Sequence, residues 1–162
     1  MSVPTASPAT SSRGFVLPRG PVLVALAYVV CVLGPILVFL GIIVFGNVDA
    51  NAPQGPVESI EGIALFGTIA LVLALGISLA FGASRGGVAA VILGVLAVVT
   101  LVFFWSGAPA VFGACAAWSA GLTRDRRPLG GAARVGGIVG AFVLLLDLVL
   151  LLGGFTLAAI QG

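Results

Sequence analysis

The chain alternates between long apolar stretches and short polar segments, and this pattern predicts five membrane-spanning helices. A helix needs about 20 apolar residues to cross a hydrocarbon core of about 30 Å. The apolar stretches cover residues 21–45, 62–81, 88–105, 109–122 and 135–158. The sequence therefore predicts an all-α fold, a polytopic integral membrane bundle that forms one unit over residues 21–160.

A short break in the apolar run over residues 88–122 indicates two helices, the third and the fourth, instead of one. Residues 88–122 are too long an apolar run for one crossing, and Ser106-Gly107-Ala108-Pro109 interrupts it directly after Trp105. Proline is favoured in the first turn of a helix, and tryptophan is favoured at membrane interfaces. We therefore expect a hairpin whose second helix, 109–122, is short.

The distribution of charge agrees with five crossings and sets their direction. All seven arginines lie in residues 1–20, 82–87 and 123–134, whereas the loop 46–61 carries three acids and no arginine. Cytoplasmic loops of membrane proteins are enriched in basic residues. This predicts a cytoplasmic amino terminus with a flexible tail at 1–20, a basic inner loop at 123–134, an acidic outer loop at 46–61 and a carboxyl terminus outside.

Composition supports a membrane location. Of the 162 residues, 60% are hydrophobic and only 7% are charged, against about 25% charged residues in soluble domains. Arginine without lysine, together with abundant Ala, Gly and Val, suggests a high-GC genome such as that of an actinobacterium. We expect a multi-pass protein of the inner (plasma) membrane.

One carboxylate, Asp147, lies near the middle of the last apolar stretch. A charge at that depth costs at least about 2.5–3.5 kcal/mol, so Asp147 needs a protein environment. Helical spacing places it on one stripe with Gly136, Gly140 and Gly154, where another helix can approach closely. Counting from the helix ends, Cys115 lies nearest its level. Thr100 lies about one turn further out.

Two interpretations of Asp147 stay open. An apolar environment favours the protonated carboxyl, which can donate a hydrogen bond and lock two helices together. Alternatively, Asp147 binds a proton or cation during transport, or contacts a basic group of a partner subunit.

Small residues predict where helices pack closely. Gly113, Ala117 and Gly121 repeat at intervals of four in the short helix, and Gly94 lies on the stripe of the preceding one. Small residues let helix backbones approach each other in membranes. We expect residues 109–122 to be the most enclosed helix of the bundle.

The remaining motifs indicate no catalytic or metal chemistry. The sequence has no histidine, no nucleophile elbow and no phosphate-binding loop, and its two cysteines fall in apolar segments. We therefore predict a protein that is not an enzyme, with no cofactor, no metal site and no nucleic-acid partner. Anionic lipid headgroups are the expected contacts of Arg124, Arg126, Arg127 and Arg134.

Residues 87–154 resemble a three-helix domain of unknown function that is common in small actinobacterial membrane proteins. The opening GVAAVILGVLAVV, a Gly/Pro turn, a short Ala/Gly helix and the glycine-rich entry GAARVGGIVGAFVLLL carry the resemblance. The two preceding helices and Asp147 depart from the usual pattern. The resemblance implies the hairpin-plus-helix topology and no activity.

Two functions fit the sequence. The first is an accessory or scaffolding subunit that binds a larger membrane assembly, or a second copy of itself, through small-residue helix faces. The second is an oligomeric proton- or cation-coupled transporter or channel that uses Asp147. The sequence shows no inverted repeat that would favour the transporter.

Overall fold

Every regular element of the computed structural model, which describes residues 17–46, 55–81 and 85–161, is helical. The elements are α1 (Gly20–Tyr28), η1 (Val29–Leu33), α2 (Gly34–Phe45), α3 (Pro56–Phe81), α4 (Gly86–Val99), η2 (Thr100–Ser106), α5 (Ala108–Ser119) and α6 (Gly131–Gln161). Most of the predicted tail and half of the predicted outer loop, including Asp49, lie outside the described residues.

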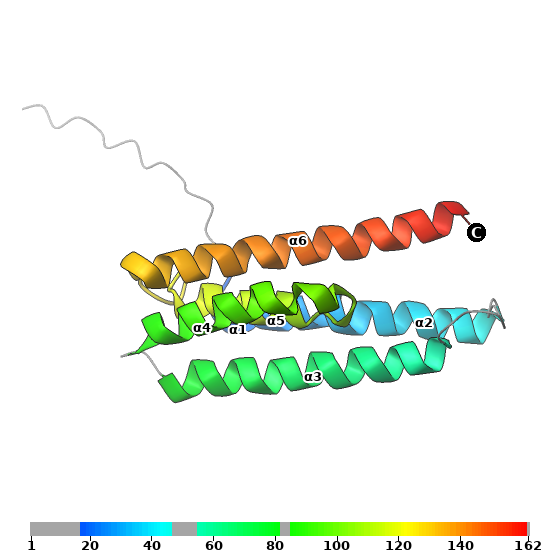
Figure 1. The fold of residues 1–162 in the computed structure, drawn as a ribbon, viewed down its shortest axis with the longest axis horizontal. Coiled ribbons are helices and arrows are strands. Elements are labelled where there is room, and N and C mark those ends of the chain that lie inside the picture. The colour runs from blue at the N-terminus through cyan, green and yellow to red at the C-terminus, as the bar shows by residue number, and fades with distance from the viewer. Residues whose placement is uncertain (1–16, 47–54, 82–84, 162) are drawn as a thin grey trace, which may run out of the picture.

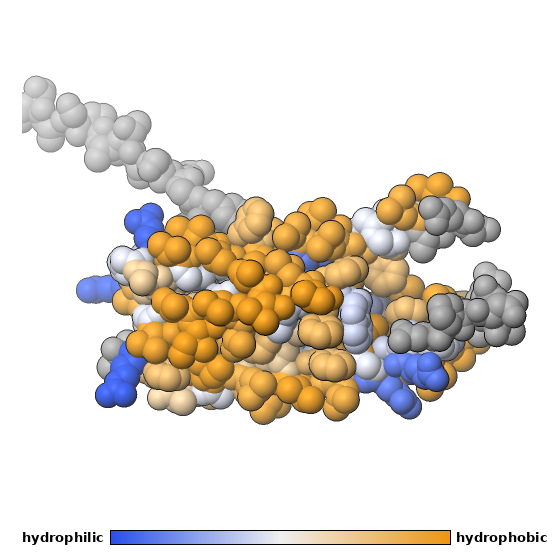
Figure 2. Space-filling model, viewed as in Figure 1, coloured by the Kyte–Doolittle hydropathy of each residue, from blue (hydrophilic) through white to orange (hydrophobic). Residues whose placement is uncertain are grey.

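Four helices in the described part of the chain are long and apolar enough to cross a membrane. They are Gly20–Phe45, which combines α1, η1 and α2, and then Pro56–Phe81, Gly86–Ser106 and Gly131–Leu157. Apolar side chains cover the flank of the bundle, and polar ones gather at its two ends (Figure 2). The all-helical fold is therefore confirmed, and its four long apolar helices suggest a multi-pass membrane protein. The fifth predicted crossing corresponds to α5, whose 12 residues span only about 18 Å.

The short helix α5 forms the centre of the bundle. It returns antiparallel to α4 after a 3₁₀ turn, and it packs against α6, α4, α1 and α3. Every one of its residues is buried, which confirms that it is the most enclosed helix. The tip of this α4–α5 hairpin stops well short of the end that α2 and α6 reach (Figure 1).

Glycines form the closest crossings between α6 and the hairpin. A methyl carbon placed on Gly94 of α4 would lie 2.7 Å from the carbonyl oxygen of Gly136, and one on Gly140 would lie 2.8 Å from that of Gly113. Real carbon atoms do not approach so closely, so only glycine fits at these positions. Ala117 is fully buried in the same helix as Gly113.

Several helix boundaries differ from the sequence prediction. Helix α3 begins at Pro56, inside the predicted outer loop, because proline is well suited to the first turn of a helix. Helix α6 begins at Gly131, inside the predicted inner loop. Helix α5 ends at Ser119, so Gly121 is not a helix-packing residue: its φ of +74° places it in the following turn, against the carbonyl of Arg127.

The end of the bundle that carries the arginines is held together by Asp125. One carboxylate oxygen accepts a hydrogen bond from the Gly20 amide at 2.7 Å, and the other accepts one from the Trp118 indole at 3.1 Å. Partial desolvation opposes ionisation of Asp125, but these hydrogen bonds outweigh it and keep its pKa below the usual value. The start of α1 is thereby fixed to the loop after α5.

Candidate functional site

The tip of the α4–α5 hairpin is inserted into a socket formed by three other helices. Ser106 and Gly107 form the turn, and α5 begins at Ala108. Val32 of η1 and Gly67 of α3 close two sides: a methyl carbon on Gly67 would lie 2.7 Å from Val32 and 3.1 Å from the carbonyl oxygen of Ser106. We call this arrangement the tip socket. It is enclosed throughout, because Ser106 and Val32 are fully buried.

Asp147 of α6 forms the remaining side of the tip socket. Its side chain is 0% exposed, and neither carboxylate oxygen makes a hydrogen bond within the described residues. The backbone N–H of Ala110 approaches the carboxylate, although the geometry falls short of a full hydrogen bond. The Cys31 side chain is close enough to interact electrostatically with the carboxylate. Asp147 therefore faces the first turn of a helix that begins inside the bundle.

The first turn of α5 explains why an acceptor is needed there. The first four N–H groups of a helix have no partner within the helix. Pro109 has no N–H, the Ala108 amide donates to the Ser106 hydroxyl at 3.3 Å, and the Val111 amide donates to the Gly107 carbonyl at 3.2 Å. Only the Ala110 amide is left, and Asp147 lies against it. A carboxylate at this position also interacts favourably with the positive end of the helix dipole.

On the opposite side of the tip socket, Pro35 leaves the backbone carbonyl of Cys31 without the usual helical hydrogen bond. Pro35 has no N–H for the carbonyl of Cys31, one turn earlier, and Cys31 lies in the wider π-helical turn η1, which ends at Leu33. Gly107 approaches this freed carbonyl so closely that no larger residue fits, and its φ is +69°. The π-helical turn in the first long helix and the hairpin turn are therefore complementary.

The structure does not bring Thr100 and Cys115 to Asp147. The Thr100 hydroxyl donates to the Leu96 carbonyl of its own helix at 2.7 Å, and Cys115 lies beside Ser78 of α3. The reason is depth. Because α6 begins four residues earlier than predicted and α5 ends three earlier, Asp147 lies opposite the start of α5 and Cys115 lies nearer its end.

Gly154 also departs from its prediction. It is exposed, and a methyl carbon placed there would meet nothing within 4 Å. The α4–α5 hairpin packs against α6 at Gly136 and Gly140, but it does not extend along α6 as far as Gly154. Gly154 lies instead in a pocket above the hairpin tip.

Sequence reasoning placed Gly107 in the hairpin turn, but it did not connect Cys31, Gly107 or the Ala110 amide with this site. The first two carried a signal: Pro35 four residues after Cys31 frees its carbonyl, and the Ser-Gly-Ala-Pro sequence is suited to a helix start. No local pattern identifies the Ala110 amide, because its partner belongs to another helix.

The four predicted lipid-contact arginines lie at one end of the bundle. Arg124, Arg127 and Arg134 are exposed. The guanidinium carbon of Arg126 instead lies 4.5 Å from the centroid of the Trp118 ring, in cation–π geometry. Lipid contact stays a prediction for all four.

The site and the fold together define a multi-pass helical membrane protein with a carboxylate buried at the start of an internal helix. Within the described residues, no three His, Cys, Asp or Glu side chains gather where they would hold a metal ion. Comparisons with protein families, with curated proteins and with solved structures find no match to this chain. The resemblance of residues 87–154 to a domain of unknown function stays a prediction.

Proposed function

We propose that this protein is an accessory subunit of the plasma membrane that binds a transmembrane helix of a partner protein. The observation that carries the proposal is an apolar groove of about 460 Å³ between α4 and α6. Six valines, two glycines and one alanine line it: Val91, Val95, Val98, Val99, Val135, Val139, Gly94, Gly136 and Ala132. We call it the valine groove.

The composition of the valine groove suits helix binding in a membrane. Helices associate there mainly through van der Waals packing, since lipid tails are as apolar as the side chains. Valine is nearly fixed in one rotamer within a helix, so the valines of the groove lose little side-chain entropy when a partner packs against them. The small-residue faces predicted from sequence are largely used inside the chain, at the crossings of Gly94 with Gly136 and of Gly113 with Gly140. The valine groove therefore replaces them as the proposed partner surface.

Photo-crosslinking tests the valine groove. A photoreactive amino acid at Val95 should give one discrete protein adduct in native membranes. Val72 on α3 is the matched control, since the two side chains are 57% and 65% exposed, and there we expect lipid adducts only. Val98→Trp should fill the groove and abolish the Val95 adduct, whereas Val72→Trp should not.

Equal adducts at Val95 and Val72, or an adduct at Val95 that survives Val98→Trp, would contradict this proposal. The mass of the adduct identifies the partner. Twice the mass of the chain would show that the groove binds a second copy instead of another protein.

We further propose that the amino terminus and all arginine-bearing segments are cytoplasmic, with the carboxyl terminus outside. The described arginines support this orientation because they lie at one end of the bundle, where α1, α4 and α6 begin. The α4–α5 hairpin begins and ends at the end of the bundle that carries the arginines, and α5 is the short fifth helix.

Thiol labelling tests the orientation. In a background without Cys31 and Cys115, an impermeant thiol reagent should label a cysteine at Gln54 in intact cells and should not label one at Leu129. Labelling at Leu129 with protection of a cysteine at Ser84 would show that residues 88–122 cross only once.

A second candidate function is proton- or cation-coupled transport through Asp147. The observation that favours it is the fully buried carboxylate, whose oxygens have no hydrogen bond within the described residues. The nearby Ala110 amide favours a structural role, and a variant that separates the two is argued in the Discussion.

A further inference from the structure

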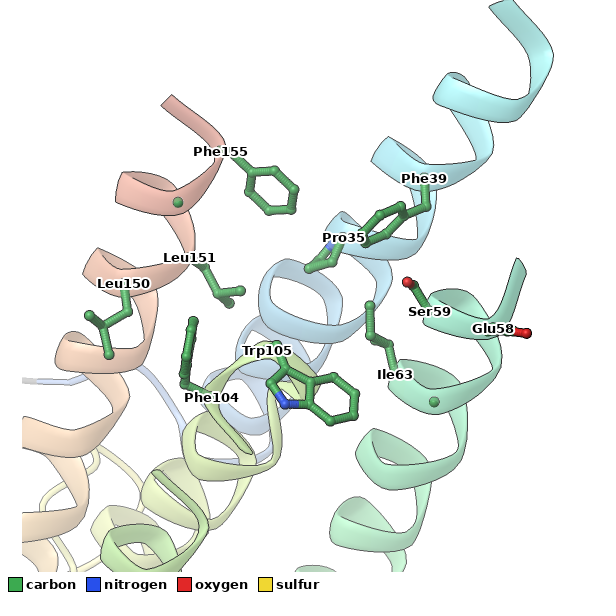
Figure 3. A pocket seen from close by; sticks show the side chains of 12 residues that line it. Pro35, Phe39, Glu58, Ser59, Ile63, Phe104, Trp105, Leu150, Leu151 and Phe155 are labelled. Carbon is green, nitrogen blue, oxygen red and sulfur yellow. The ribbon is translucent and has the colours of Figure 1, made fainter. Parts of the chain in front are cut away.

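A second cavity lies above the hairpin tip, at the end of the bundle opposite the arginines. Because the hairpin is short, α2, α3 and α6 continue beyond it without a helix between them (Figure 1). They enclose a pocket of about 470 Å³ whose floor is formed by Phe104 and Trp105 of the tip (Figure 3). Pockets for small molecules commonly measure about 300–1,000 Å³.

Aromatic rings from three directions line the pocket. Phe39 comes from α2, Phe155 from α6, and Phe104 and Trp105 from the hairpin tip. The Trp105 ring makes edge-to-face contacts with Phe66 and Phe103, with centroids 5.8 and 6.5 Å away. Trp105 is thus held in a fixed orientation. Aromatic faces attract cations, tryptophan most strongly, in addition to burying apolar surface.

The mouth of the pocket carries negative charge. Glu58 and Ser59 of α3 border it, and Figure 3 shows the Ser59 hydroxyl turned toward the pocket and the Glu58 carboxylate turned outward. The charged side chains of the described residues at this end are Glu58 and Glu61, both acids. Each described arginine lies at the opposite end. A cation is therefore attracted to this mouth, and an anion is repelled.

We propose that the pocket binds lipophilic organic cations, with the apolar body among the aromatic rings and the positive charge near Glu58. This site is distinct from the valine groove, which lies on other faces of the bundle and is lined by other residues. It goes beyond the accessory function, because partner binding at the groove does not require it. Loss of cation binding and loss of the crosslink at Val95 are therefore separate results.

Tetraphenylphosphonium and tetraphenylborate provide a matched test, since they have the same shape and opposite charge. The full-length protein is placed in phosphatidylcholine nanodiscs, and binding is measured by equilibrium dialysis, with the signal of empty nanodiscs subtracted. We expect saturable binding of one tetraphenylphosphonium per chain. We expect no saturable binding of tetraphenylborate.

Two glycines on open surface provide a matched pair of variants. A methyl carbon placed on Gly154 or on Gly76 would meet nothing within 4 Å, so both leucine variants should fold, but only Gly154 lines the pocket. Gly154→Leu should weaken tetraphenylphosphonium binding at least tenfold, whereas Gly76→Leu should leave it unchanged. Glu58→Gln would remove the proposed ion pair between the exposed Glu58 carboxylate and the bound cation, and it should weaken binding about threefold to fivefold.

Three results would overturn the proposal. Saturable binding no greater than that of empty nanodiscs would show that the pocket binds no such ligand. Equal binding by the wild type and Gly154→Leu would place the ligand elsewhere. Equal saturable binding of the borate, or unchanged phosphonium affinity in Glu58→Gln, would show that the pocket does not select for positive charge.

Discussion

Asp147→Leu is expected to lower the free energy of unfolding by about 1–2 kcal/mol, whereas Asp147→Asn should fold and behave like the wild type. The average hydrogen bond between membrane helices contributes only about 0.6 kcal/mol. Asp147 should contribute more, because the Ala110 amide that it faces has no other acceptor at the start of α5. Asparagine retains an acceptor oxygen in a side chain of the same shape. Thermal unfolding in mild detergent measures both variants.

Val149→Leu is the matched control, because Val149 lies on the same helix and is 63% exposed. It should leave the midpoint of unfolding unchanged. A leucine variant as stable as the wild type would show that the start of α5 needs no acceptor from α6. An asparagine variant as unstable as the leucine variant would show that the charge itself is required.

Asp147→Asn also separates the two candidate functions. Proton or cation flux is measured in vesicles that contain the wild-type or variant protein. If Asp147 only completes the first turn of α5, any flux should be the same for both. A well-folded asparagine variant that loses a flux measurable in the wild type would establish the transporter function.

Gly113→Leu is expected to be the more damaging substitution, with a loss of about 1–3 kcal/mol or more in the free energy of unfolding. Gly113 lies where α5 crosses α6, and any side chain there would overlap the carbonyl of Gly140. Backbone on both sides of the crossing leaves no flexible group that can move aside. The same thermal measurement in detergent detects the loss.

Gly76→Leu is the control for Gly113→Leu, since it adds the same side chain to a helix position with no neighbour within 4 Å. It should have little effect. If both glycine variants unfold at the same temperature as the wild type, α5 does not pack against α6 as closely as the structure indicates.

Sequence patterns predicted the helices well because membrane crossing depends on local composition. The apolar run from Pro21 to Phe45 and the break at Ser106–Pro109 are visible in any window of the sequence, and the structure places a helix and a hairpin turn there. Boundaries were predicted less accurately. Helices α3 and α6 begin within segments whose polar residues suggested loops, because polar residues are tolerated in helices outside the hydrocarbon core.

The surroundings of Asp147 were predicted only in part, for a different reason. Periodicity placed the carboxylate on the glycine stripe of α6, and the structure buries it there, facing the hairpin. Which residue meets it depends on the relative depth of two helices. An offset of five residues along α5, about 7.5 Å, was enough to replace Cys115 with Ala110 at the start of α5. Such shifts depend on contacts such as that of Gly94 with Gly136, which no single helix specifies.

The order in which α5 and α6 are synthesised determines when the start of α5 can meet Asp147. Residues of α5 leave the ribosome before those of α6, so the Ala110 amide enters the membrane before its acceptor exists. During that interval the hairpin carries an amide without an acceptor, which is costly in hydrocarbon. Insertion of α6 ends this state by supplying the carboxylate together with the glycine face that encloses α5. Helix α6, which is synthesised after α5, is therefore the one that completes the packing of the earlier helices.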